Sequence, residues 1–331
     1  MPLEGRSSNN NNSTAMKNKI KIPNPPPHAN FHFGFSEDPN LKRRRRMEDS
    51  HAFFYDFKSI ANCGFFAIYD GHGGKSAADW CGANLHRVLQ ENWDRDPQGS
   101  IPQLLDRTFM ECDEQLDPAH GIYSGCTAIV SVIVPDEKDP SIRTLYSANV
   151  GDARAVLCRR KKALRLSFDH QARVPEEKQR IKECGGIVIN DRVNGTLAVT
   201  RALGDASMKE FITGHPFTTE TRLLPPDQDS FLILACDGLW DVCTDQEACD
   251  YIQNDIDDPQ KCAELLVNFA LEQGSTDNLS VIVVRLAGID ITQSEENENN
   301  TENSAKTIDS DDSDKITHHD PSVPNDPYTL T

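Results

Sequence analysis

The chain has 331 residues and a formal net charge of −18, because 52 Asp and Glu outnumber 34 Lys and Arg. This excess of acid argues against a general nucleic-acid binder, which needs a basic face to neutralise phosphates. No stretch approaches the ~20 apolar residues that a membrane helix needs, and we expect no membrane attachment.

Residues 1–30 are predicted to be a disordered N-terminal segment. They contain an Asn run and a proline-rich stretch of low complexity, and no apolar region typical of a secretory signal. Pro23 and Pro26 form a PxxP pattern with two interpretations. It is either a stiff linker or a polyproline II ligand for an SH3 adaptor.

Residues 31–287 are predicted to form one domain of the α+β class. Short β-rich runs, which alternate or are continuously apolar as buried strands are, lie at 63–70, 126–134, 143–150, 153–158, 231–236 and 279–286. Helical patterns lie between them at 75–93, 101–116, 175–185, 245–253 and 259–274. Gly185 and Gly274 are typical helix stops. Strands follow one another in pairs with short connections, which favours antiparallel sheets with helices grouped outside.

Residues 288–331 are predicted to be a disordered acidic tail, because they hold eleven acids, two lysines and almost no large apolar side chain. Ser310 and Ser313 are candidate phosphorylation sites in it, and an inert solubilising tail is the alternative. The ten cysteines form no CxxC and no zinc-finger spacing. We interpret them as reduced core residues of a cytoplasmic or nuclear protein.

Carboxylates at the ends of apolar strands are the most informative feature of the sequence. Asp70 ends one such run, Asp237 follows another with Asp241 four residues on, and Asp277 precedes a third. In addition, Glu48 and Asp49 come just before an aromatic run, and Asp152 joins two strands. Taken singly, each is explained by a turn or a helix N-cap. Together they predict that the strand ends converge.

Converging carboxylates would form a set of oxygen ligands. Mg²⁺ and Mn²⁺ prefer such ligands, and two such ions can activate a water and clamp a phosphate. The carbonyl of Gly71 is a further candidate ligand. His72, two residues from Asp70, is either a polar loop residue or a group that protonates a leaving alkoxide.

Lys42 and the four arginines Arg43, Arg44, Arg45 and Arg46 form the longest basic run. Three interpretations are open. The run is a localisation signal, a solvated turn, or a phosphate-binding site in which the planar guanidinium of one arginine binds phosphate oxygens in a bidentate way. Composition alone does not say which arginine.

The order of motifs resembles the metal-dependent protein serine/threonine phosphatases of the 2C family. The motifs that carry this resemblance are, in chain order, RRRMED (44–49), DGHGG (70–74), SGCTA (124–128), NVGDAR (149–154), DH (169–170), GG (185–186), RVNGTLAVTRALGD (192–205), DGLWD (237–241) and DN (277–278). The resemblance covers residues 31–287 and comes nearest to small fungal members that act on stress-activated MAP kinase signalling. It implies a four-layer α-β-β-α sandwich, with two antiparallel sheets flanked by helices.

The resemblance also implies roles for individual residues. Asp70 would bridge two Mg²⁺ or Mn²⁺ ions, the Gly71 carbonyl would bind the first, and Asp237 and Asp277 would bind the second. Glu48 would hold metal-bound water in the outer shell. Asp152 and Asp241 match positions linked to a weaker third ion. Arg44 matches the phosphate-binding arginine and His72 the general acid.

The function that follows is hydrolysis of phosphoserine and phosphothreonine in protein substrates, MAP kinases among them, by a metal-activated water without a phosphoenzyme. We expect a monomeric, cytoplasmic or nuclear negative regulator of a kinase pathway. A catalytically inactive adaptor of the same fold is the first alternative. A nuclease with the same two-ion chemistry is the second, and the absence of an extended basic groove in the sequence counts against it.

Overall fold

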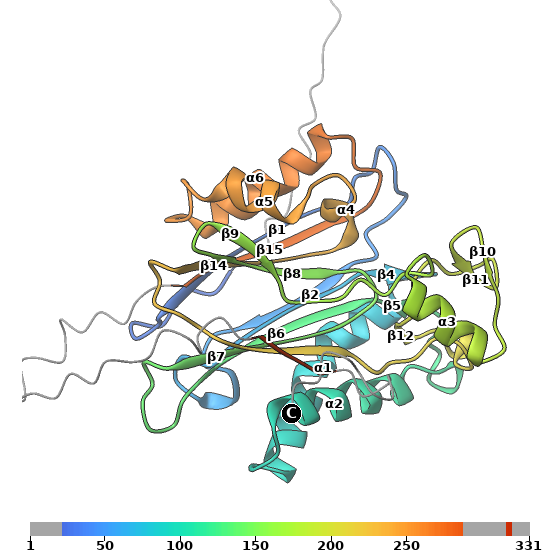
Figure 1. The fold of residues 1–331 in the computed structure, drawn as a ribbon, viewed down its shortest axis with the longest axis horizontal. Coiled ribbons are helices and arrows are strands. Elements are labelled where there is room, and N and C mark those ends of the chain that lie inside the picture. Colours follow the sequence, from blue (N-terminus) through green and yellow to red (C-terminus); the bar gives the residue numbers. More distant parts are fainter. Residues whose placement is uncertain (1–21, 287–315, 320–331) are drawn as a thin grey trace, which may run out of the picture.

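Two antiparallel sheets lie face to face, and helices cover their outer faces (Figure 1). The computed structural model describes residues 22–286 and 316–319. Within them the predicted α+β class and the four-layer order, helices, sheet, sheet, helices, are confirmed.

The first sheet has five strands, each antiparallel to its neighbours. In spatial order they are β1 (Phe31–Asp38), β15 (Leu279–Leu286), β14 (Asp229–Ala235), β8 (Arg154–Arg159) and β9 (Lys162–Arg165). The second sheet has six strands, also antiparallel. They are β16 (Ile316–His319), β13 (Phe217–Arg222), β7 (Arg143–Val150), β6 (Ala128–Pro135), β3 (Gly64–Tyr69) and β2 (Ser50–Phe54).

Helices pack on the outside of each sheet. The second sheet is covered by α1 (Ser76–Arg95) and α2 (Ile101–Gln115), and the first by α4 (Asp237–Trp240), α5 (Asp245–Ile252) and α6 (Pro259–Glu272) (Figure 1). No helix in the described ranges is both long and apolar enough to cross a membrane.

Strand alternation explains why both faces of each sheet are buried. Along β15, Ile282 and Val284 belong to the core between the two sheets, whereas Val281 and Val283 belong to the core under the helices with Leu266 of α6. Successive side chains of a strand point to opposite faces, so a continuously apolar strand supplies two cores at once. This is why the runs at 231–236 and 279–286 read as unbroken apolar segments.

Smaller elements lie at one end of the sandwich. β4 (Gly71–His72), β5 (Gly125–Cys126) and β12 (Leu203–Gly204) form a three-stranded ribbon. Beside it lie α3 (Pro175–Glu183) and the pair β10 (Val188–Ile189) and β11 (Arg192–Val193) (Figure 1). Three 3₁₀ turns, η1 (Phe57–Ser59), η2 (Pro118–His120) and η3 (Ala206–Met208), complete the described chain.

The five predicted helices are present, and their ends lie within two residues of the predicted ones. Gly185 and Gly274 follow α3 and α6 with φ of +82° and +87°, so both end a helix in the left-handed conformation that glycine adopts without strain. Within residues 22–286, four strands of the two large sheets have no counterpart among the predicted runs: β1, β2, β9 and β13.

Residues 22–30 correct the predicted N-terminal boundary, because they lie on the domain instead of being disordered. Ile22 packs against the core between the sheets, and the His28 imidazole lies 2.9 Å from the Asp56 carboxylate. Pro23 and Pro25 line a groove of about 930 Å³ beside β1 and α6. The remainder of the N-terminal prediction, residues 1–21, lies outside the described residues.

The predicted disordered tail is corrected at four residues. Ile316–His319 form β16, which pairs with β13 at the edge of the second sheet. The rest of 287–331, with Ser310 and Ser313, lies outside the described residues. Among the ten cysteines, nine are buried as expected, whereas Cys184, after the end of α3, is exposed.

Candidate active site

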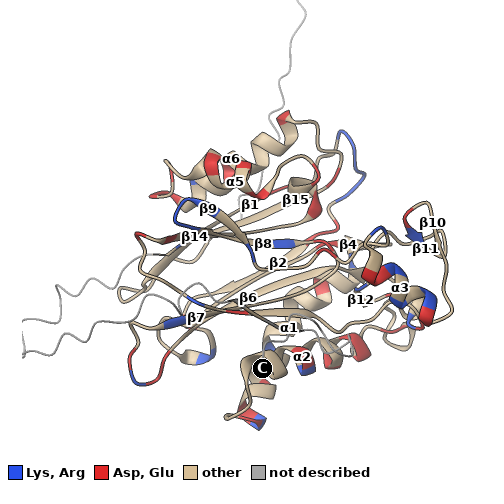
Figure 2. Ribbon diagram, in the orientation of Figure 1, with Lys and Arg blue, Asp and Glu red and all other residues tan. Residues whose placement is uncertain are grey.

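Six carboxylates lie close enough to act on one another's charge. Figure 2 shows acidic ribbon beside β4. The antiparallel pairing brings these carboxylates together, because β3, β7 and β14 end where β2, β8 and β15 begin. We call this set the acidic end: Asp49, Asp70, Asp152, Asp237, Asp241 and Asp277.

The centre of the acidic end has the composition of a metal site. One ligand atom each from Asp49, Asp70 and Cys236 lies within 4.8 Å of the others. Asp49 Oδ2 accepts a hydrogen bond of 2.7 Å from Ser280 Oγ, but Asp49 Oδ1 and Asp237 Oδ1 are buried with no hydrogen-bond partner among the described residues. A buried carboxylate oxygen without a partner is costly. A cation bound there would remove that cost.

Burial first, and then mutual repulsion, disfavours the charged form of the carboxylates at the acidic end. Burial raises the pKa of Asp70 well above its ordinary value, and the charges of Asp49, Asp237 and Asp277 raise it further. The pKa of Asp237 is raised in the same way, by burial first and then by its acidic neighbours. Divalent ions would relieve this repulsion, and carboxylate oxygens match the preference of Mg²⁺ and Mn²⁺. The Cys236 sulfur is not one of these ligands, because burial raises the pKa of its thiol well above the ordinary value. The residues therefore fit the predicted ions.

Asp152 and Asp241 lie on the side of the acidic end towards α4. Burial raises the pKa of Asp152 to about 6, partly offset by the hydrogen bond of 2.7 Å that its Oδ2 accepts from Gln171 Nε2. Burial and then the charge of Asp277 raise the pKa of Asp241. The charges of these two residues act on the same cluster, and their place near a third ion stays a prediction.

Glu48 and Gly71 lie at the margin of the acidic end. A Cβ at Gly71 would come 2.4 Å from the carbonyl oxygen of Glu48, so the two backbones are in close contact. The Glu48 carboxylate forms an ion pair with Arg46, with Nε 2.6 Å from Oε1. Asp49, its neighbour, is only 1% exposed and forms the centre of the cluster. Sequence reasoning gave the role to Glu48 and none to Asp49.

Arg44 reaches the acidic end from the loop between β1 and β2. Its Nη2 contacts the Asp277 carboxylate, and its Nε donates a hydrogen bond of 3.2 Å to the Thr276 carbonyl. The side chain is 48% exposed, so one side of the guanidinium faces solvent. Among the four consecutive arginines, Arg44 is the one that contacts a predicted metal ligand.

His72 is paired with Asp205, a residue for which the sequence predicts no role. His72 Nε2 lies 2.6 Å from Asp205 Oδ2, and both side chains are mostly buried. Gly125 lies directly beneath the pair, since a Cβ there would come 2.2 Å from Asp205 Oδ2 and 2.5 Å from His72 Nε2. The only sequence signal for Asp205 was its place at the end of the motif at 192–205.

The structure therefore brings Asp70, Asp237, Asp277, Asp152 and Asp241 into one charge cluster, with the remaining predicted residues around it. This is the convergence that the sequence predicted. The individual roles stay predictions, because contacts alone do not assign them.

Comparisons with known proteins agree with this arrangement. The sequence model of the family described as "Protein phosphatase 2C" matches residues 33–279. "Protein phosphatase 2C homolog 1" of Schizosaccharomyces pombe is 49% identical over 251 residues, which covers 76% of this chain and 72% of the relative. The protein of the same name from Saccharomyces cerevisiae is 44% identical over 261 residues, with 76% and 92% covered.

Solved structures show the same fold. The crystal structure of a serine-threonine phosphatase 2C from Toxoplasma gondii is similar with a TM-score of 0.68. The match covers 80% of this chain and 98% of that chain, at 20% sequence identity. At this identity the likeness concerns the fold alone.

Proposed function

The chain belongs to the protein phosphatase 2C family and is a protein serine/threonine phosphatase, and we propose that its reaction takes place at the acidic end. The observation that carries this proposal is the cluster of mutually repelling, partly unpartnered carboxylates at the converging strand ends. Buried carboxylates without a counter-ion destabilise the fold, and bound cations would remove that cost.

Asp70, Gly71, Asp237 and Asp277 would hold two Mg²⁺ or Mn²⁺ ions, with Glu48 in the outer shell and Asp152 and Asp241 at a weaker third ion. When bound, such ions supply a nucleophilic water at neutral pH and neutralise charge on the phosphate. Asp49 contributes the charge of a buried carboxylate at the centre of the cluster.

Arg44 binds the phosphate of the substrate. Its guanidinium already contacts one carboxylate, has an open side towards solvent, and presents the planar donor fork that matches phosphate oxygens. Held there, the phosphate is oriented for in-line attack. We expect the loss of Arg44 to raise the KM for a phosphopeptide more than it lowers kcat.

His72 gives a proton to the leaving serine or threonine oxygen. Asp205 accepts a hydrogen bond from the Nε2 proton of His72 and so fixes the ring in one orientation. The protonated ring then carries a second proton, at Nδ1, that can pass to the leaving oxygen. Asp205 acts as a positioning residue in this step.

The leaving group offers the sharpest test of these roles. A serine or threonine alkoxide needs a proton as it leaves, whereas p-nitrophenolate does not. We therefore expect His72→Ala to lower kcat about a hundredfold on a phosphothreonine peptide and much less on p-nitrophenyl phosphate, with metal saturating. Equal losses on both substrates would contradict the assignment of His72 as the general acid. Arg44→Ala is the matched control, because it should impair both substrates alike.

The biological role that we propose is negative regulation of a kinase pathway, by a monomer in the cytoplasm or nucleus. The support is the resemblance of the motifs to those of small fungal members that act on such signalling, and two fungal proteins of the family are similar to this chain. MAP kinases of a stress-activated cascade are the proposed substrates. The purified chain should remove phosphothreonine from a doubly phosphorylated MAP kinase and leave phosphotyrosine. Retention of the phosphothreonine would contradict this substrate.

For the PxxP pattern we favour the stiff linker over the SH3 ligand. Pro23 and Pro25 line a groove of the chain's own domain, so part of the segment faces β1 and α6 instead of a partner.

A further inference from the structure

The loop that carries Arg44 bears more positive charge than phosphate binding by one arginine explains. Residues 41–46, here called the arginine loop, contain Lys42 and four arginines. Figure 2 shows them as a continuous basic stretch on the loop between β1 and β2, at the same end of the molecule as the acidic end. Arg44 contacts Asp277 and Arg46 contacts Glu48.

The other three cations have no such partner. Lys42, Arg43 and Arg45 are exposed, and their side chains form no hydrogen bond or ion pair with the described residues. In a chain of net charge −18, these three neighbouring exposed cations make the loop a local centre of positive charge. An anionic ligand would supply the counter-charge for these three side chains.

The backbone of the arginine loop is fixed although these side chains are exposed. Asn40 Nδ2 donates hydrogen bonds to the carbonyls of Ser275 at 2.8 Å and Asp277 at 3.0 Å, at the start of the loop. Asn278 Nδ2 donates to the carbonyls of Pro39 at 2.8 Å and Arg46 at 3.1 Å, closing the other end.

These four bonds tie the loop to the segment that contains the predicted ligand Asp277. Within the loop, the backbone N–H groups of Arg43 and Arg44 donate to the Asn40 carbonyl at 2.8 Å and 2.9 Å. The three cations are therefore presented at a fixed place beside the acidic end, and little backbone entropy is lost when they bind a ligand.

We propose that Lys42, Arg43 and Arg45 form a substrate subsite for anionic groups that flank the phosphorylated serine or threonine. The ligand chemistry is a carboxylate or a second phosphate close in sequence to the residue that is dephosphorylated. The proposal rests on the proposed function, in which Arg44 holds the scissile phosphate. Adjacent Cα atoms of the loop are 3.8 Å apart and an extended peptide advances about 3.3 Å per residue, so the flanking anion lies within about three positions.

Charges at the rim of a site act over several ångströms and are screened by salt. Each exposed pair contributes little alone, but three together are worth about tenfold in binding. The subsite should therefore lower the KM for anionic peptides at low ionic strength and lose that effect as salt increases. A neutral peptide has no group to occupy it.

The test compares kcat/KM of the full chain, with Mn²⁺ saturating, on three phosphothreonine peptides. One has neutral flanks, one has Asp and Glu at the three positions on each side, and one carries a second phosphate instead. The variant is the triple substitution Lys42→Ser, Arg43→Ser and Arg45→Ser. The control is Lys138→Ser, Lys161→Ser and Lys162→Ser, which removes three exposed cations from the far end of the sheets.

We expect the wild type and the control triple to prefer an anionic peptide over the neutral one by about tenfold at low salt, mainly through KM. The arginine-loop triple should lose that preference, and the two anionic peptides show whether carboxylate or phosphate is the better ligand. No preference in the wild type, or an equal preference in the arginine-loop triple, would overturn the subsite. Failure of the wild type to hydrolyse any of the three peptides would instead contradict the proposed function.

Discussion

The carboxylates of the acidic end repel one another, and the folded chain bears that repulsion until cations neutralise it. Asp70 is one of the residues that bear this repulsion, because four other aspartates raise its pKa in addition to burial. An uncharged side chain of the same shape at this position should therefore have opposite effects with and without metal.

Asp70→Asn is expected to raise the melting temperature of the metal-free protein by about 2–4 °C, the shift that ~1 kcal/mol gives in a domain of this size. The same substitution should abolish the rise that Mn²⁺ produces in the wild type, since binding to the folded state alone is what stabilises it. Differential scanning calorimetry in EDTA and in Mn²⁺ measures both. A variant that keeps the Mn²⁺-dependent rise would show that Asp70 is not a ligand.

Gly125 tests the His72–Asp205 pair without changing either residue. The Cβ of Gly125→Ala would lie closer to both side chains than real contacts allow, so the pair must move apart while the fold accommodates the shift. We expect kcat on a phosphothreonine peptide to fall at least tenfold, with a smaller loss on p-nitrophenyl phosphate. A kcat within twofold of the wild type on the phosphopeptide would mean that the pair has no part in catalysis.

At the level of single residues, the sequence predicted the positions that share one pattern, an acid at the end of an apolar strand. Asp70, Asp237 and Asp277 follow from it because strand ends in antiparallel sheets converge. Asp205 does not, since it follows a two-residue strand and lies opposite His72 only through tertiary folding. Asp49 was given no role, because its full burial beside a partly buried Glu48 depends on tertiary packing that the local sequence does not contain.

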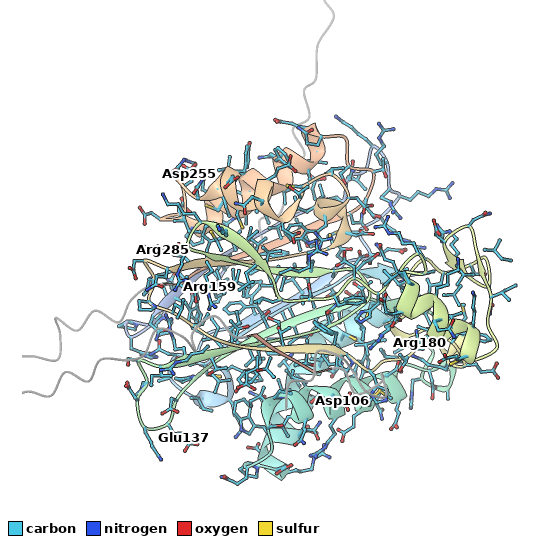
Figure 3. All side chains as sticks on the ribbon, viewed as in Figure 1. Asp106, Glu137, Arg159, Arg180, Asp255 and Arg285 are labelled. Carbon is cyan, nitrogen blue, oxygen red and sulfur yellow. The ribbon has the colours of Figure 1, made fainter. Side chains whose placement is uncertain are left out.

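Among the elements, α3 is held to the body of the domain by a buried charge. Glu177 accepts hydrogen bonds from Arg201 at 2.7 Å and from Thr200 Oγ1 at 2.6 Å, and its partner Arg201 is only 1% exposed. Arg180, labelled on α3 in Figure 3, donates to the same carboxylate at 3.0 Å. Burial alone would raise the pKa of Glu177, but Arg201 and its other cationic neighbours outweigh burial and lower it.

Glu177→Gln is expected to lower the free energy of unfolding by about 3 kcal/mol at pH 7, because it removes the carboxylate charge that faces the buried Arg201 guanidinium. Since the folded-state pKa lies below the unfolded value of 4.5, the wild type has the full stabilisation above pH 4.5 and loses it as the pH falls towards the folded-state pKa. The difference between wild type and variant should therefore shrink below pH 4.5. Urea unfolding at pH 7 and pH 4 measures it.

The exposed neighbour Glu176 provides the control, and Glu176→Gln should change stability by less than about 0.5 kcal/mol. A difference for Glu177→Gln that stays constant down to pH 4, or grows, would contradict the ion-pair account.

Helices were easier to predict than strands for physical reasons. α1, α2 and α6 have apolar stripes at helical spacing, and α3 and α6 have glycine after their ends. β13 was missed because its buried side chains include Thr218, Thr219 and Thr221, which give no apolar alternation. Its burial comes from neighbouring elements that the local sequence does not contain.

Three apolar cores separate the four layers of secondary structure. The candidate active site lies at one end of this sandwich. Strand β13 is covered by β16. The four residues of β16 belong to the segment that composition predicts to be disordered. Pairing of this kind protects an edge and adds little to the core.

Truncation after residue 287 is therefore expected to leave kcat/KM on a phosphothreonine peptide within twofold of the full chain. It should increase amide hydrogen exchange along β13, where β16 is removed, and leave exchange in β15 unchanged. Mass spectrometry of exchanged peptides measures this, with β15 as the internal reference. Equal exchange along β13 in both chains would show that β16 does not cover the edge in solution.

The central claim is that the acidic end holds the metal ions that make this chain a phosphatase. Phosphate release from a phosphothreonine peptide by the full chain, in Mn²⁺, in Mg²⁺ and in EDTA, with Asp70→Asn alongside, tests it most directly. We predict release that requires a divalent ion, disappears in EDTA and falls at least a hundredfold in the variant. Release that persists in EDTA or in folded Asp70→Asn would contradict the claim, and no release from the folded wild type would point to the inactive adaptor.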